Sequence, residues 1–161
     1  MTSACDDSPP IIIQIDGEAV PFARAGSNGT RRFTKPRQAE FMNRVRDAGK
    51  RAMGGLKPLE GPLLAQMRFY FVAPASWSQK KREAALWVSS RPDLDNYCKA
   101  ILDSLGRRVE QRGNIEVIDD CVFIDDAQVC DLEAQKRYGP RAQVVVTFSE
   151  LGVSTREVIA S

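Results

Sequence analysis

The sequence contains no histidine among its 161 residues, and its four cysteines form no Cys-X-X-Cys pair. A structural zinc site is therefore not expected, and histidine-based acid–base catalysis is excluded. The chain also lacks an apolar run of membrane-spanning length, a Gly-rich phosphate loop and an EF-hand spacing. Any general base in this protein is therefore expected to be a carboxylate or a metal-bound hydroxide.

The composition is that of one ordinary folded domain, with 43% hydrophobic and 27% charged residues. We expect a domain over 11–150, flanked by a flexible tail at 1–10 and another at 151–161. The first ten residues show no basic region followed by an apolar run, so we expect no signal peptide and a cytoplasmic protein. We interpret Cys98 and Cys130 as small core residues.

Charge is distributed unevenly along the chain. Between residues 22 and 57 there are ten Lys or Arg and two acids, whereas between 93 and 133 there are eleven acids and four bases. A basic segment suits a polyanion and an acidic one suits a cation. The sequence therefore predicts a molecule that binds both, although a solvated helix face would also explain the bases.

Hydrophobic periodicity predicts an alternation of strands and helices. Strands are expected at 11–15, 63–72, 121–124, 129–135 and 142–149, and helices at 37–53, 78–88 and 94–105. The last two strands are expected to pair through a turn at 138–141, and 107–120 is left unassigned. On the helix at 37–53, Arg44, Arg46, Lys50 and Arg51 are expected to be exposed.

The helix at 94–105 has the clearest pattern in the sequence. Its apolar stripe is followed by Gly106, and Asp93 stands where an N-cap belongs. On the opposite face Asp95, Lys99 and Asp103 follow one another at four-residue steps, with Asn96 alongside. Taken alone, Asp95 and Lys99 are explained by a surface ion pair contributing roughly 0.3–0.5 kcal/mol.

Two acidic pairs change that interpretation. Asp93 and Asp95 crowd one helix end, and Asp125 and Asp126 follow an apolar stretch. Like charges this close are offset most simply by a cation, and Mg²⁺ prefers carboxylate oxygens together with substrate phosphates. The working hypothesis is a metal-dependent enzyme acting on phosphate esters. Lys99 would stabilise developing negative charge, or would neutralise Asp95 in the free protein.

RPDLDNYCKAILDSL at 91–105 followed by IDDAQV at 124–129 resembles the signature of the RusA-type Holliday junction resolvases. The AVPFAR segment with its arginine-rich sequel and PASWSQKKREAALW support the resemblance. It implies that Asp93, Asp95 and Asp126 are metal ligands and that Lys99 is the essential basic residue. Asp125 is assigned as a further ligand. Asn96, Asp103 and Gln128 match the surrounding pattern and are assigned supporting functions.

The resemblance further implies a compact α/β fold, a mixed sheet carrying two to three helices, and a homodimer. The expected activity is a bacterial or phage-encoded endodeoxyribonuclease of recombination and repair. It would resolve four-way junctions by paired symmetric nicks with 5′-phosphate ends, using Mg²⁺ or, as a substitute, Mn²⁺. No small-molecule cofactor and no membrane partner are expected. The expected DNA contacts are Arg24, Arg31, Arg32, Lys35, Lys80, Lys81 and Arg82.

The connection GRRVEQRGNIEVIDDCVF is longer than the family usually has, and it adds a further acidic pair, Asp119 and Asp120. Arg107, Arg108 and Arg112 in it are either an added DNA contact or a solvated loop. The main alternative is a protein that binds branched DNA with weak or no nuclease activity. A hydrolase of nucleotides or other small phosphate esters is a second alternative. Mg²⁺ titration of DNA cleavage separates binding from catalysis.

Overall fold

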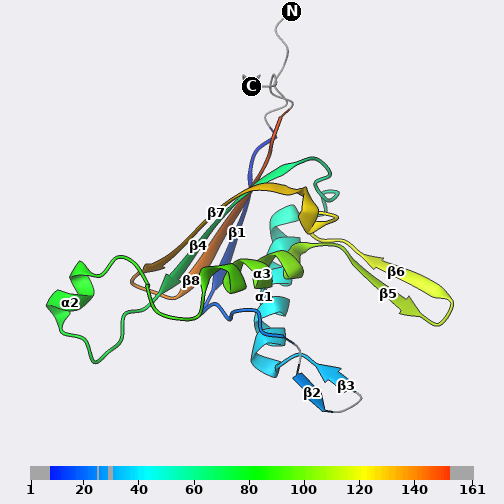
Figure 1. Cartoon of the computed structure of the whole chain (residues 1–161). Coiled ribbons are helices and arrows are strands. Elements are labelled where there is room, and N and C mark those ends of the chain that lie inside the picture. The colour runs from blue at the N-terminus through cyan, green and yellow to red at the C-terminus, as the bar shows by residue number, and fades with distance from the viewer. Residues whose placement is uncertain (1–7, 25, 29–30, 153–161) are drawn as a thin grey trace, which may run out of the picture.

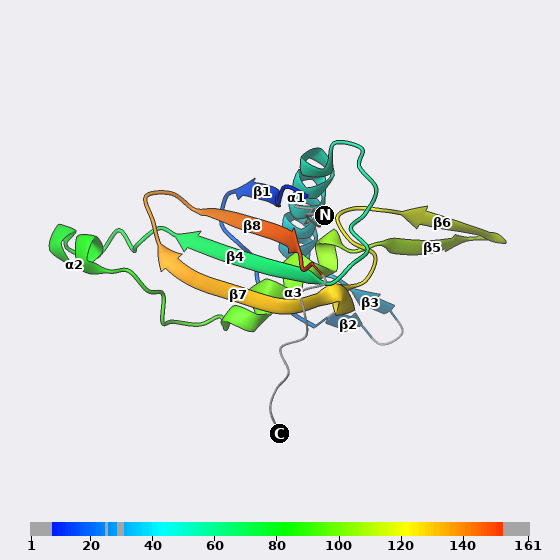
Figure 2. The same ribbon diagram turned by 90° about the horizontal axis from the view of Figure 1, so that it is seen from above.

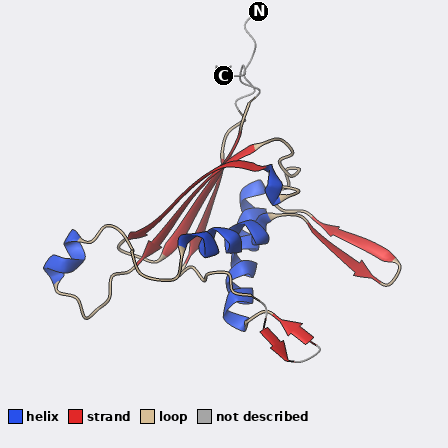
Figure 3. Cartoon of the chain, in the orientation of Figure 1, coloured by secondary structure: helices blue, strands red, loops and turns tan. Residues whose placement is uncertain are grey.

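The computed structural model describes residues 8–24, 26–28 and 31–152, and describes no side chain within 25–33. A four-stranded sheet forms its centre (Figures 1 and 3). The strands lie in the order β1 (Ile11–Asp16), β8 (Gln143–Glu150), β4 (Leu63–Phe71) and β7 (Val129–Tyr138). The sheet is mixed, since β4 runs antiparallel to β8 and parallel to β7. The predicted α/β fold class is confirmed.

The predicted pairing between the last two strands is wrong. Strand β4 lies between β7 and β8 and bonds to both. Its alternate residues, from Leu63 to Phe69, are completely buried, so this apolar strand takes the centre of the sheet. The turn after β7 therefore carries the chain past β4 instead of closing a two-stranded hairpin.

Helices α1 (Pro36–Met53) and α3 (Leu94–Leu105) pack on one face of this sheet (Figure 2). Phe41 and Ile101, both fully buried, join the sheet's inward residues in one hydrophobic core. The helices approach closely at Gly49, where an added Cβ would lie 2.5 Å from Leu105 Cδ2. Helix α1 ends as predicted, at Gly54 in the left-handed region with φ 56°.

The third helix, α2 (Gln79–Ala84), is shorter than the predicted helix over 78–88. Ser78 Oγ accepts a hydrogen bond from Lys81 N and caps it, as expected for a serine there. Beyond Ala84 the chain is extended instead, and Trp87 forms a β-bridge with Arg137 of β7. The segment after Ala84 pairs with the edge strand β7, and this pairing replaces a further helical turn.

The unassigned segment 107–120 forms a hairpin of β5 (Arg108–Arg112) and β6 (Ile115–Asp119). It projects away from the body of the molecule in two perpendicular views (Figures 1 and 2). A smaller hairpin of β2 (Gly26–Asn28) and β3 (Arg31–Phe33) lies where an irregular loop was expected. The predicted strand at 121–124 is wrong, since only isolated bridges occur there, at Phe123.

Two burial predictions are also wrong. Arg46 is only 4% exposed, because its guanidinium bonds to the carbonyls of Ser104 and Gly106 and to Asp119 at the hairpin base. Cys130 is exposed, because it lies near the start of the edge strand β7. Within the described ranges, none of the helices has the length and apolar character needed to cross a membrane.

Candidate active site

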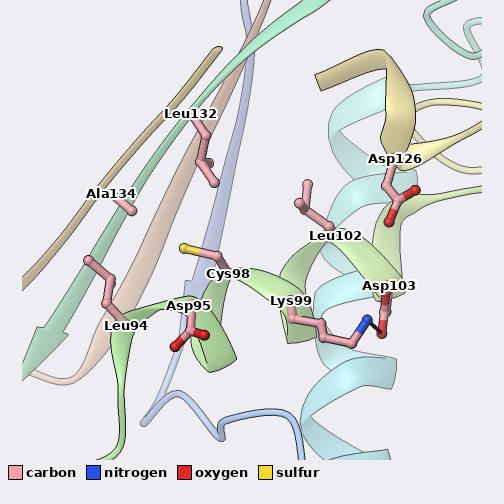
Figure 4. Close-up of a pocket in the computed structure, with 9 residues that line it drawn as sticks. All are labelled: Leu94, Asp95, Cys98, Lys99, Leu102, Asp103, Asp126, Leu132 and Ala134. Atoms are coloured by element: carbon pink, nitrogen blue, oxygen red, sulfur yellow. Dashed lines mark ion pairs between the residues drawn. The ribbon is translucent and has the colours of Figure 1, made fainter. Parts of the chain in front are cut away.

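A groove of about 590 Å³ runs between α3 and the edge strand β7 (Figure 4). Three carboxylates and one amine line it: Asp95, Lys99 and Asp103 from α3, and Asp126 from the short 3₁₀ helix η1 (Asp126–Gln128). Its remaining lining is apolar: Leu94, Cys98, Leu102, Leu132 and Ala134. The structure thus brings acids from two separate elements to one surface.

Lys99 lies beside the acids along one face of α3. Its Nζ is 3.4 Å from Asp103 Oδ2, so the helix ion pair joins Lys99 to Asp103 and not to Asp95 as expected. The same Nζ lies 4.8 Å from the centre of the Phe22 ring, which holds it by a cation–π contact. About half of the Lys99 side chain is exposed, so the ammonium remains accessible to an anion in the groove.

The IDDAQV motif folds into a tightly bonded turn. Asp125 Oδ1 accepts from Ala127 N at 2.8 Å, and Gln128 Oε1 accepts from the backbone amides of Ile124 and Asp125. Gln128 Nε2 donates to the carbonyls of Leu59 and Gly61 at 2.8 and 3.0 Å. Asp125 and Gln128 therefore fix the turn, and Asp126 is the aspartate of the pair whose side chain lines the groove.

Asp93 occupies the N-cap position of α3 but forms no side-chain capping bond, and it does not line the groove. The loop before it is tied to β7, because Lys136 Nζ donates to the carbonyls of Ser90 and Pro92. No local sequence pattern predicts this tether. Asn96 is half-buried. Its backbone carbonyl accepts a hydrogen bond from Phe22 N at 2.9 Å, which docks the N-terminal segment on α3.

A second hollow of about 300 Å³ adjoins the groove and shares Leu102, Asp103 and Asp126 with it. Arg107 and Asp125 line its far side. Arg107 stands at the base of the projecting hairpin and pairs with Asp120. Asp119 pairs with Arg46 and Lys50. The additional acidic pair of the long connection is thus bound into the hairpin base, which leaves Asp126 as the groove's acid from this region.

The predicted basic contacts lie in separate places. Arg24 and Lys35 are exposed near α1. Arg31 and Arg32 belong to β3, and their side chains lie outside the described residues. The basic helix α2 lies apart from β2 and β3 in both views (Figures 1 and 2).

All of the basic side chains of α2 are exposed, but two of the three have structural contacts. Arg82 donates to the carbonyls of Ala75 and Trp77, and Lys81 Nζ lies 4.1 Å from the centre of the Trp77 ring. Lys80 has no such contact among the described residues. It is therefore the most available of the three for an anionic ligand.

Burial and charge both act on Cys98, which lies in the groove wall. Desolvation, with the neighbouring Asp95 carboxylate, raises the pKa of the thiol to about 11. The thiol therefore stays neutral near pH 7, and it contributes packing to the apolar wall of the groove.

The donor set fits a hard cation, since it consists of carboxylate oxygens. In the part of the chain that the structure describes, no three His, Cys, Asp or Glu side chains converge closely enough to enclose a metal ion by themselves. Mg²⁺ commonly takes one or two protein carboxylates and keeps waters and substrate phosphates as its other ligands. The open arrangement of Asp95 and Asp126 is compatible with that mode of binding.

Comparison with known proteins identifies relatives. The family model described as "Endodeoxyribonuclease RusA" matches residues 17–149, which span α3, the η1 turn and the whole groove. The uncharacterized protein YqaN of Bacillus subtilis (strain 168) is 31% identical over 99 residues. That alignment covers 58% of this chain and 61% of YqaN, so the chain spans less than two thirds of this relative's length.

Proposed function

The chain belongs to the RusA endodeoxyribonuclease family, and on that premise we propose that it is a Mg²⁺-dependent endonuclease that resolves four-way DNA junctions by paired symmetric nicks. The observation that carries the proposal is the shared groove of Asp95, Lys99, Asp103 and Asp126. Acids beside a polyanion repel it unless a cation intervenes, so this surface suits hydrolysis better than binding alone.

In this proposal Asp95 and Asp126 would hold the metal ion, and Asp93, at the N-cap two residues before Asp95, would supply a further carboxylate. The ion would supply a water that is acidic enough to attack near neutral pH and would offset charge on the phosphate oxygens. Lys99, half-exposed and beside Asp103, would bind the scissile phosphate or stabilise its developing charge. Asp125 and Gln128 position Asp126.

We further propose that the active form is a homodimer. A four-way junction has twofold symmetry, so two nicks on related strands require two active sites related by the same symmetry. Sedimentation velocity of the purified protein tests this part independently of cleavage. A monomer that nonetheless makes simultaneous paired nicks would contradict it.

The decisive experiment replaces Asp95 by Asn, which keeps the size of the side chain and removes its charge. Loss of an outer partner of a metal ligand already lowers activity roughly 10–100-fold, so removing a ligand should cost more than about a hundredfold in the cleavage rate. Junction binding should persist or strengthen, because the phosphates lose a repulsive neighbour. The readout is strand-resolved cleavage of a synthetic four-way junction over a Mg²⁺ titration.

Asp131→Asn is the matched control, because Asp131 is an exposed aspartate of β7 outside the groove. Its cleavage rate should remain close to that of the unmodified protein. If Asp95→Asn cleaves equally well, the catalytic proposal is wrong. If the unmodified protein binds the junction at every Mg²⁺ concentration and never cuts it, the protein is a branched-DNA-binding protein instead.

A further inference from the structure

The hairpin of residues 107–120, here called the arm, has features that the groove alone does not explain. It begins at Arg107, which lines the hollow shared with Asp103 and Asp126, and it then extends away from the body (Figures 1 and 2). A ligand at the base of the arm therefore lies next to whatever occupies the acidic groove, and a long ligand can extend from there to the outer part of the arm. The arm also belongs to the connection that is unusually long in this chain.

The base of the arm is rigidly held. Arg46 and Lys50 of α1 bond to the Asp119 carboxylate at 2.8 and 2.7 Å, and Arg107 pairs with Asp120. Five backbone pairs, from the Arg108–Asp119 pair to the Arg112–Ile115 pair, continue outward to a turn at Gly113, whose φ is 65°. The strand pairing and the ion pairs at the base together hold the ribbon in its projecting position.

The arm presents apolar side chains to solvent on both of its faces. Val109 and Ile118 are paired across the two strands next to the base and are 53% and 52% exposed, while Ile115, on the opposite face near the tip, is 67% exposed. Exposed β-branched side chains on both faces of a narrow ribbon lose hydrophobic free energy unless something covers them. The arm is therefore built to contact an apolar surface.

Charge indicates which kind of surface that is. The arm has three arginines and four acids. Three of the acids are paired: Glu110 with Arg112 and Asp120 with Arg107 within the arm, and Asp119 with α1. Glu116 accepts from Gln111 Nε2 at 3.3 Å. With so little free positive charge, the arm is poorly suited to phosphates. Exposed base faces at a DNA branch point are apolar and adjacent to the scissile strand.

We propose that the arm is a wedge that inserts Val109, Ile115 and Ile118 against unstacked bases at the branch point of the DNA substrate. Apolar side chains placed between base steps unstack them and stabilise a distorted duplex. Fully paired linear DNA offers no open base face, so the wedge favours branched substrates over continuous ones. This inference rests on the proposed function, because it assumes that the groove binds a DNA backbone.

The test uses the full chain with Val109, Ile115 and Ile118 all changed to Ser. A four-way junction carries 2-aminopurine beside its branch point, and EDTA prevents hydrolysis. The unmodified protein should raise the fluorescence of this base analogue, and the triple variant should not. Losing three half-exposed apolar contacts should weaken junction affinity by about tenfold or more, while affinity for a linear duplex stays unchanged.

Two further proteins keep the result interpretable. Ile12→Ser combined with Val72→Ser removes two apolar side chains of similar exposure, 61% and 58%, away from the arm, and should behave like the unmodified protein. In the second, 109–118 is replaced by Asn-Gly, which closes a two-residue hairpin and retains the braced base. It should reproduce the defect of the triple variant, which excludes a local folding fault.

Each remaining outcome overturns one specific part. Unchanged fluorescence, or equal losses on junction and duplex, removes the wedge. A change in sedimentation of the triple variant would show instead that the arm contacts a second copy of the chain. If the unmodified protein unstacks the branch point but never cleaves with Mg²⁺, the wedge stands and the proposed nuclease function fails. If it cleaves without a fluorescence change, the wedge alone fails.

Discussion

Replacing Arg46 by Ala should destabilise the protein far more than any other arginine substitution on α1. The Arg46 guanidinium is 4% exposed and donates to two carbonyls, those of Ser104 and Gly106, as well as to the carbonyl and carboxylate of Asp119, at 2.7–3.0 Å. One side chain thus links α1 to the end of α3 and to the base of the arm. Its removal leaves the three carbonyls without this donor, while the Asp119 carboxylate keeps its bond from Lys50.

The magnitude follows from those contacts. Removing one partner of a buried ion pair costs roughly 3–5 kcal/mol, and because Asp119 is 44% exposed and regains water, the lower end of about 3 kcal/mol applies. For a chain of this size that loss lowers the melting temperature by about 6–12 °C. Arg51→Ala, on an exposed position of the same helix, should change stability by less than about 0.5 kcal/mol.

Urea unfolding followed by far-UV circular dichroism measures the free energy of unfolding of both variants. A hydrogen bond from Lys50, and then the one from Arg46, lower the pKa of Asp119 below its ordinary value of 3.8. A depressed carboxyl pKa contributes stability above that ordinary value, and the contribution is lost as the pH falls through the folded value. The loss of unfolding free energy in Arg46→Ala should therefore be full near pH 7, and it should become smaller only below about pH 3.8. Equal stabilities of Arg46→Ala and Arg51→Ala would refute the reasoning.

Two other substitutions or treatments have defined outcomes. Gln128→Ala removes four hydrogen bonds of the turn that carries Asp126, so cleavage should fall by about tenfold or more while junction binding is largely kept; full activity would show that the turn holds itself. In a Cys5→Ser background, iodoacetamide at mildly alkaline pH should label exposed Cys130 first. Cys98 should react slowly, because burial raises its pKa to about 11. Mass spectrometry of the digested protein reads the order, and faster labelling of Cys98 would contradict its placement.

Sequence patterns were sufficient to predict the elements that bury only one face. The period of α3 and the alternation along β4 repeat often enough that a single packing face is specified, and both elements lie where they were predicted. Asp95, Lys99 and Asp103 then share a surface simply because they lie at four-residue steps on one helix. The grouping of Asp126 with them depended on tertiary structure and was expected from the family resemblance.

What the sequence did not predict depends on long-range partners. Arg46 has the appearance of a surface arginine until Asp119, far along the chain, is brought to it. The arm has neither strong periodicity nor a covered face, so nothing local distinguishes it from a solvated loop. The order of β7, β4 and β8 is decided by which strand is most apolar across the whole sheet, and a short turn between two strands does not reveal that.

Strands β4 and β7 are hydrogen-bonded neighbours, although everything from α2 to η1 lies between them in the sequence. All of the proposed catalytic residues therefore lie in one segment of the chain, and both ends of this segment continue into strands of the same sheet. A backbone break at the Gly113 turn would leave two fragments, each holding one of the two neighbouring strands. The Gly113 turn is therefore the position at which the backbone can be cut, or a reporter inserted, while both fragments stay bound through the sheet.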